Sequence, residues 1–227
     1  NRLPDRPAAD SSVLRQSDIG VETTGFDLTL ESPVGPGTLV YGFDFYHDEV
    51  DSSGYQSDLL SGPRSESLPV ADNSDYDLFG TYAQYVWKPV ERLEITGGAR
   101  YTYAEASLGR FYDATGTLQG DQSEHWDAAG RSLRAVYSLH DCWSIYGGAS
   151  QAFRAPNLDD LTGNLTAKSG TTSLGSVNLD PEKFITYELG TRHSTDTTAV
   201  NLAVYYTDVE DMIVSTFKDS KLPPAVA

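Results

Sequence analysis

Cysteine and methionine each occur once in the 227 residues, and basic residues are half as common as acidic ones. The single thiol, Cys142, has no partner for a disulfide within the chain and cannot form a cluster of thiolate metal ligands. Lys and Arg number 16 against 33 Asp and Glu, which gives a net charge of −17. Because such a surface repels phosphate backbones, the composition argues against nucleic-acid binding.

Long apolar runs are also missing. No stretch approaches the roughly 18 consecutive apolar residues of a membrane-spanning helix, so a helical membrane protein is excluded. A membrane β-barrel is not excluded, because its strands alternate apolar and polar residues and so have an average composition. The 14 Tyr and 20 Gly residues favour strands and turns.

What the sequence does contain is a repeated alternation of apolar and polar residues. Within residues 92–104, Leu93 and Tyr101 fall on one side of an extended chain, and Glu94 and Arg100 fall on the other. This period of two predicts a β-strand. The same period recurs in seven further segments, which are residues 24–30, 39–48, 78–87, 132–139, 143–153, 184–192 and 198–208.

The connections between these eight predicted strands alternate strictly between short and long. The short ones are residues 31–37, 88–91, 140–142 and 194–198, and the long ones are residues 49–77, 105–127 and 154–183. An up-and-down membrane barrel has short turns at one end and long loops at the other. We therefore predict sequential antiparallel strands with every long loop at the same end, and we expect the loop from Arg154 to Glu182 to contribute no strand pairing.

The two faces of the predicted strands differ in chemistry. We expect the apolar face to carry aromatic residues near the strand ends, namely Trp87, Tyr101, Tyr103, Trp143 and Tyr206. We expect the opposite face to carry Asp27, Asp44, Glu94, Arg100, Arg134, Glu188 and Arg192. This pattern is typical of an outer-membrane barrel with a wet interior. The alternative is an ordinary antiparallel sheet with one face in solvent.

Residues 150–164 read SQAFRAPNLDDLTGN, followed by VNLDPEKFITYELGTR at 177–192 and AVYYTDVEDMI at 203–213. Together these segments resemble the barrel of TonB-dependent outer-membrane receptors. In that family a strand ends in a Phe-Arg-Ala-Pro-Asn-like segment, and a Pro-Glu followed by a Tyr-Glu-Leu-Gly-like strand leads back. The residues that match in order and spacing are Phe153, Arg154, Ala155, Pro156, Asn157, Pro181, Glu182, Tyr187, Glu188, Leu189 and Gly190.

The resemblance implies an all-β fold, an antiparallel up-and-down transmembrane β-barrel segment of about eight strands forming an open arc of a 22-stranded barrel. Residues 1–227 would be a partial receptor barrel domain without a plug domain, in the outer membrane of a bacterium. The implied function is energy-coupled uptake of a scarce nutrient such as a ferric siderophore or cobalamin. The implied partners are outer-membrane lipid, a small nutrient ligand and TonB, which would act through a plug domain absent from this chain.

The resemblance also suggests a ligand-binding role for Arg154 and Asn157 at the extracellular mouth. The competing interpretation is a scaffold, in which Pro156 ends strand pairing and Glu188 and Arg192 balance charge in the lumen. Haem uptake is disfavoured, because residues 157–182 contain no His. We expect no enzymatic activity, no cofactor and no metal site.

Two other functions remain open from the residues alone. A free-standing eight-stranded barrel of structural or adhesive role would fill its interior by pairing Glu94, Arg100, Arg134, Glu188 and Arg192 with one another. A soluble acidic β-domain acting on carbohydrate would need two carboxylates, such as Glu182 and Glu188, about 5 to 9.5 Å apart.

Metal chemistry has little support in the sequence. The four histidines, His47, His125, His140 and His193, have no metal-ligand spacing. Residues 72–77 offer oxygen ligands for calcium but lack the central Gly and distal Glu of a helix-loop-helix site, so a solvated acidic loop is the favoured interpretation.

Overall fold

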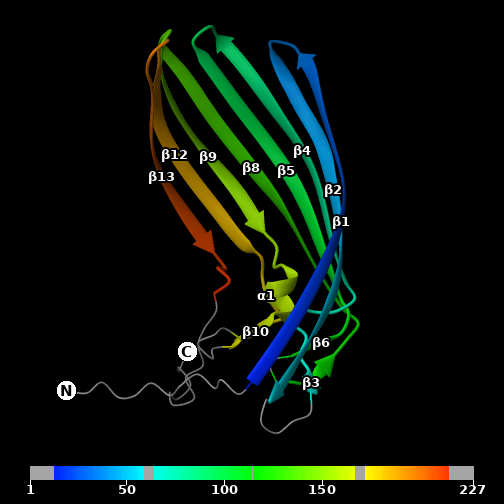
Figure 1. Ribbon diagram of the computed structural model, residues 1–227. Coiled ribbons are helices and arrows are strands. Elements are labelled where there is room, and N and C mark those ends of the chain that lie inside the picture. Colours follow the sequence, from blue (N-terminus) through cyan, green and yellow to red (C-terminus); the bar gives the residue numbers. More distant parts are fainter. Residues whose placement is uncertain (1–12, 59–63, 114, 167–171, 215–227) are drawn as a thin grey trace, which may run out of the picture.

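The computed structural model describes residues 13–58, 64–113, 115–166 and 172–214, and these form one large curved antiparallel sheet (Figure 1). The eight long strands follow the chain in sequential order, with a short strand, β3, paired to β2. They are β1 (Val13–Val34), β2 (Gly37–Asp58), β4 (Ser74–Val90), β5 (Leu93–Leu108), β8 (Gln122–His140), β9 (Trp143–Arg154), β12 (Glu182–Ser194) and β13 (Ala199–Glu210). The predicted all-β, up-and-down order of eight strands is confirmed.

The shorter elements all lie in the long connections. They are β3 (Arg64–Glu66), β6 (Phe111–Tyr112), β7 (Leu118–Gln119), α1 (Leu158–Thr162), β10 (Asn164–Thr166) and β11 (Thr172–Leu174). Figure 1 shows α1, β3, β6 and β10 at one end of the sheet and the short turns at the other. The expectation that all long loops share one end is therefore confirmed. Gly35 in the β1–β2 turn has φ +56°, a left-handed conformation that favours glycine.

Several strands are longer than predicted. β1 and β2 contain 22 residues each, and their pairing continues without interruption from Val34–Gly37 to Val13–Asp58. The apolar alternation ends near Asp48, but backbone hydrogen bonds do not require apolar side chains, so the ladder continues through polar residues. The strands therefore project beyond the apolar part of the sheet at the long-loop end.

The strand register places the predicted polar residues on one face. Arg100 lies opposite Tyr82 on β4 and Gly130 on β8, and Glu188 lies opposite Gly148 on β9. Because side chains alternate along each strand, this register puts all seven predicted polar residues on the same face. The buried residues Ala104 and Ala106, next to α1, share the face of Arg100. We call this face the inner wall.

The opposite face is apolar and exposed, and we call it the outer wall. Leu202, Val204 and Tyr206 of β13 are each 65% exposed, and Leu189 of β12 is 63% exposed. Phe26, Phe45, Phe79 and Tyr101 form an aromatic rim toward the loops, and Trp87, Tyr137 and Trp143 form one toward the short turns. Arg131 of β8 and Gln151 of β9 are also exposed on this face. An exposed surface that is otherwise mainly apolar is a liability in water and typical of a lipid-facing wall.

The outer wall becomes polar beyond the aromatic rim at the loop end. There His47 contacts Asp77, with Nδ1 2.8 Å from Oδ1, and Tyr103 donates to Glu105 at 2.8 Å. Together the two aromatic rims and this polar margin define an apolar band crossed by all eight long strands. The band contains no helix, and none of the helices in the described ranges is long and apolar enough to cross a membrane.

The charges of the inner wall are not paired as a small closed barrel would require. Arg100 forms a bidentate pair with Asp44, at 2.8 and 2.7 Å, and Glu94 pairs with Lys88 at 3.3 Å. Arg134 instead lies 4.9 Å from the centre of the Tyr146 ring. In the sheet, β1 pairs only with β2 among the long strands, and β13 pairs only with β12. The described strands thus form an open arc, which does not support the free-standing barrel.

Candidate functional site at the mouth of the arc

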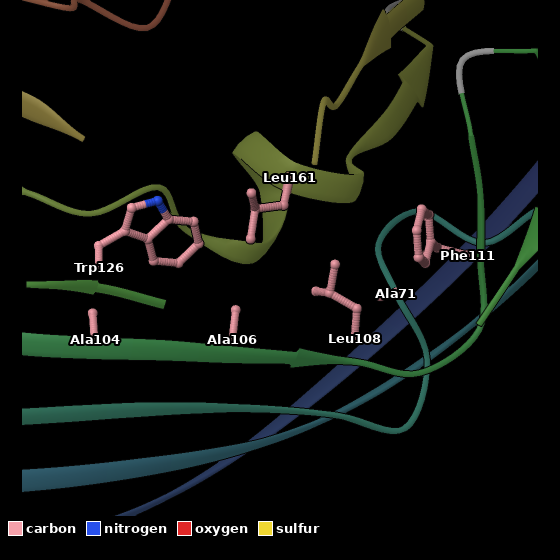
Figure 2. Close-up of a cluster of buried hydrophobic side chains, with 7 residues drawn as sticks. All are labelled: Ala71, Ala104, Ala106, Leu108, Phe111, Trp126 and Leu161. Carbon is pink, nitrogen blue, oxygen red and sulfur yellow. The ribbon is translucent and has the colours of Figure 1, made fainter. Parts of the chain in front are cut away.

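We call the loop end of the inner wall, together with the long connections there, the mouth. A small apolar core joins these connections. It consists of Ala71, Ala104, Ala106, Leu108, Phe111, Trp126 and Leu161. Figure 2 shows Leu161 of α1 and Trp126 of β8 lying over Ala104, Ala106 and Leu108 of β5. The prediction that the loop from Arg154 to Glu182 contributes no strand pairing is wrong, because this loop contains the β10–β11 pair, and Arg154 itself pairs with Glu182.

Arg154 lies at the last position of β9, on the inner wall. Its Nε donates to Glu182 Oε2 at 2.6 Å, and its Nη1 donates to Asp160 Oδ2 at 2.8 Å. β9 ends at Arg154, two residues before Pro156, which is buried and has no N–H to continue the ladder. The guanidinium therefore joins the end of one strand, the start of the next and helix α1.

Glu182 accepts a second hydrogen bond, from the backbone N of Ile213 to Oε1 at 2.8 Å. The Arg154 guanidinium, with a further contribution from the Ile213 N–H, lowers the pKa of this carboxyl below its usual value. In turn, the hydrogen bond to Glu182 raises the pKa of Arg154. Both groups are charged at neutral pH. Through Ile213, Glu182 also holds the chain that follows β13 against the start of β12.

Asn157 is the N-cap of α1. Its Oδ1 accepts from the backbone N of Asp160 at 2.8 Å, while its own backbone N donates to Asp160 Oδ2 at 3.0 Å. This reciprocal pair is a capping box, which satisfies two N–H groups that a helix start leaves open. One carboxylate oxygen of Asp160 thus accepts from both Arg154 and Asn157.

Of the remaining residues of the family-like motif, some lie beside this centre and others lie farther along β12. Phe153 and Ala155 are half-buried against the apolar core. On the inner wall, a side chain at Gly190 would overlap the ring of Tyr146, whose hydroxyl donates to Asn201 Oδ1 at 3.1 Å. Glu188 lines a hollow of about 310 Å³ together with Glu94 and Arg134. Pro181 is half-buried, directly before Glu182.

Some contacts at the mouth could not be expected from the sequence. Tyr76 of β4 donates to the carbonyl of Pro156 at 3.1 Å, and Trp126 Nε1 donates to the carbonyl of Leu179 at 3.0 Å. These partners are separated by 80 and 53 residues. By contrast, Asn157 and Asp160 stand at the capping-box spacing, a local signal that could have predicted α1.

The carboxylates of residues 72–77 are bound to other groups of the chain. Asp72 accepts from Arg110 at 2.8 Å and from the Ser52 backbone at 3.0 Å, whereas Asp77 contacts His47 on the outer wall. Across the described ranges, no group of three or more His, Cys, Asp or Glu side chains is arranged to hold a metal ion. Glu182 and Glu188 lie six positions apart on β12, about 20 Å at the usual rise of a strand. This distance is too long for the carbohydrate mechanism.

An open antiparallel arc with an exposed, mainly apolar outer wall and a polar inner wall defines the chain as part of a membrane β-barrel. The family model described as "TonB dependent receptor-like, beta-barrel" matches residues 4–225. The chain therefore belongs to the TonB-dependent receptor family and is an outer-membrane protein.

Curated relatives agree with this assignment. The chain is 29% identical over 158 residues to the pesticin receptor of Yersinia enterocolitica, covering 68% of the chain and 22% of that protein. It is 23% identical over 201 residues to the iron-regulated outer membrane virulence protein of Vibrio cholerae, covering 88% of the chain and 26% of that protein. The chain thus spans about a quarter of the length of these relatives.

Solved structures share the fold. The copper transporter OprC superimposes with a TM-score of 0.70 at 19% identity, covering 87% of this chain and 32% of that one. The ferric yersiniabactin uptake receptor FyuA from Yersinia pestis superimposes with a TM-score of 0.69 at 21% identity, covering 89% and 30%.

Proposed function

We propose that the chain forms part of the wall and extracellular mouth of a receptor that takes up a scarce nutrient, with energy coupling, across the bacterial outer membrane. The observation that carries the proposal is the arc itself, whose outer wall suits lipid and whose inner wall carries fixed charges. Membership of the receptor family supports it. Lipid is the partner of the outer wall, and TonB, acting through a plug domain, is the proposed source of energy.

A ferric siderophore is the ligand class that the comparisons favour over cobalamin. The names of two matched proteins refer to iron regulation and to ferric yersiniabactin uptake. Iron chelates of this kind carry carboxylate, catecholate or hydroxamate oxygens, which are hydrogen-bond acceptors. A receptor mouth with a fixed cation and amide donors is suited to bind them.

Arg154 and Asn157 are the proposed ligand contacts. The Arg154 side chain is 41% exposed, and within the described residues no acceptor contacts its Nη2. Asp160 and Glu182 hold the guanidinium in place, so its free edge is preorganised for an anionic group. Asn157 is exposed, and its side-chain amide nitrogen carries two further donors.

The test uses the full-length receptor in detergent, titrated with ferric catecholate, ferric trihydroxamate, ferric citrate and cyanocobalamin. We expect saturable binding of at least one ferric chelate, measured by quenching of tryptophan fluorescence. Binding of cyanocobalamin alone would overturn the ligand assignment. Binding of none of the four, by a receptor that is folded, would count against the proposed function.

A matched pair of variants tests the contact residues. Arg154→Gln should weaken binding of the preferred chelate by about tenfold or more, the loss expected for one charge-assisted hydrogen bond. Arg110→Gln is the control, because Arg110 also lies at the mouth and also bonds a carboxylate, Asp72, at 2.8 Å. Equal affinity of both variants, at equal assembly into the membrane, would make Arg154 a scaffold residue.

A further inference from the structure

The β9–β12 connection is joined to the rest of the mouth by buried contacts. Leu161 and Thr162 of α1 are only 1% and 3% exposed. Leu161 lies against the part of the core formed by Ala106 and Leu108 of β5 (Figure 2). Moving α1 away would expose these apolar groups to water, which opposes the movement.

Thr162 forms a hydrogen-bonded clamp between two connections. Its Oγ1 accepts from the backbone N of Ala71 at 2.9 Å and donates to the carbonyl of Leu158 at 2.9 Å. Beside it, the backbone N of Asn164 donates to the carbonyl of Pro69 at 2.8 Å. Ala71 is fully buried, so its N–H would have no water to replace Thr162 if the clamp opened locally.

Two segments of the connection, residues 155–164 and 174–181, which we call its arms, also hold each other. Gly175 N donates to the carbonyl of Gly163 at 2.7 Å, and Ser176 N donates to the carbonyl of Asp160 at 3.0 Å. The capping box and the Arg154 ion pairs fix the start of the first arm. The second arm is held through the Trp126 indole, which donates to Leu179.

We infer that these two arms form a fixed wall of the mouth, already in place before a ligand arrives, and that Thr162 is the residue that positions it. The inference deepens the proposed function, because a fixed wall presents Arg154 and Asn157 to the ligand without rearrangement. Any closure over a bound ligand then has to come from other segments of the receptor. The fixed state itself does not depend on which ligand is bound.

Hydrogen exchange of the full-length receptor in detergent, without any ligand, tests this inference. Amides within residues 67–73, 158–164 and 174–181 should exchange at least about 1,000-fold more slowly than in an unstructured peptide, as expected for a region that opens rarely. Exchange near the unstructured rate would show a mobile flap and overturn the inference. Since no ligand is used, a failure to bind ferric chelates would refute the proposed function without affecting this result.

Variants of Thr162 test its positioning role. Thr162→Val should raise exchange of residues 67–73 and 158–164 by about tenfold or more, because it leaves the Ala71 N–H unsatisfied. Thr162→Ser should restore protection. Thr195→Val is the matched control, since Thr195 Oγ1 also donates to a carbonyl and accepts from an N–H, both of Thr198, but in a short turn at the other end.

Unchanged exchange in Thr162→Val, with an intact barrel, would remove Thr162 from this role. If that variant does not assemble, the measurement on the natural receptor still decides between a fixed wall and a flap.

Discussion

The banded part of the arc and its mouth are built from the same strands but are held together in different ways. Across the apolar band, each long strand forms its backbone hydrogen-bond ladder only with its sequence neighbours, and side-chain contacts such as Arg100 to Asp44 reach one strand further. At the mouth, Leu161, Thr162 and Trp126 connect segments 53 to 91 residues apart through a buried core and individual hydrogen bonds. The difference separates a wall held by backbone pairing between neighbouring strands from a mouth held by side-chain packing between distant segments.

The largest expected effect distinguishes the mouth from the wall. Leu161→Ala should lower the free energy of opening the mouth by about 2–5 kcal/mol, the usual cost of emptying a buried leucine site. Unfolding of the band should hardly change, because α1 contributes no pairing to the long strands. Hydrogen exchange of residues 158–164 and denaturant unfolding of the barrel measure the two quantities separately.

Leu174→Ala is the control for that experiment, since Leu174 is 47% exposed in the same connection. Loss of both mouth protection and barrel stability in Leu161→Ala would show that the two regions form one cooperative unit.

The next effect tests the lipid-facing wall. Leu202→Arg should destabilise the folded receptor by up to about 2–4 kcal/mol, because a cation within the apolar band is poorly solvated. Ala203→Arg is the matched control, since Ala203 is the next residue on β13 and faces the inner wall. Urea titration in lipid vesicles measures both, and equal losses would contradict the assignment of the two faces.

A smaller effect is expected for a charge pair of the inner wall. Arg100→Met leaves the carboxylate of Asp44, only 7% exposed, without its bidentate partner and should cost about 1.5–3 kcal/mol. Lys88→Met breaks the exposed pair with Glu94 and should cost about 0–1 kcal/mol. If the two variants unfold at the same urea concentration, Arg100 makes no special contribution to the wall.

These two regions also differ in how well the sequence predicts them. The period of two placed Glu94 and Arg100 on the inner wall and Tyr101 on the outer wall, because burial against lipid acts on every second residue. The same signal ends near Asp48, where both faces are polar, so the sequence does not predict the C-terminal part of β2. Thr162 and Ala71 are 91 residues apart, and no local pattern relates them.

The motif around Arg154 is partly predictable from the sequence. The resemblance to receptors included Arg154, Asn157 and Glu182 among its eleven matching residues, and the structure brings these three together with Asp160. Their contacts within the chain are those of a scaffold. The ligand-binding role stays a prediction, and it rests on the exposed edge of the Arg154 guanidinium. The sequence could not show that Asp160 shares one oxygen between the helix cap and the guanidinium, because this depends on the path of the chain after Pro156.

The smallest effect is the pH dependence of the mouth. The pKa of Glu182 is lowered in the folded receptor, so its pairing contributes stability that is fully present above the unfolded pKa of the carboxyl. That contribution is lost as the pH falls below the unfolded pKa and through the lowered folded one, when the carboxyl accepts a proton and no longer pairs as an anion with Arg154. Protection of residues 154–164 and of Ile213 against hydrogen exchange, corrected for the intrinsic pH effect, should therefore decrease in strongly acidic solution.

Glu182→Gln should already show the reduced protection at neutral pH and lose most of this dependence. Glu105→Gln is a suitable control, because Glu105 is bonded to Tyr103 on the outer wall, away from α1. An acid transition that persists unchanged in Glu182→Gln would have to come from another carboxylate of the mouth, of which Asp160 is the nearest to Arg154.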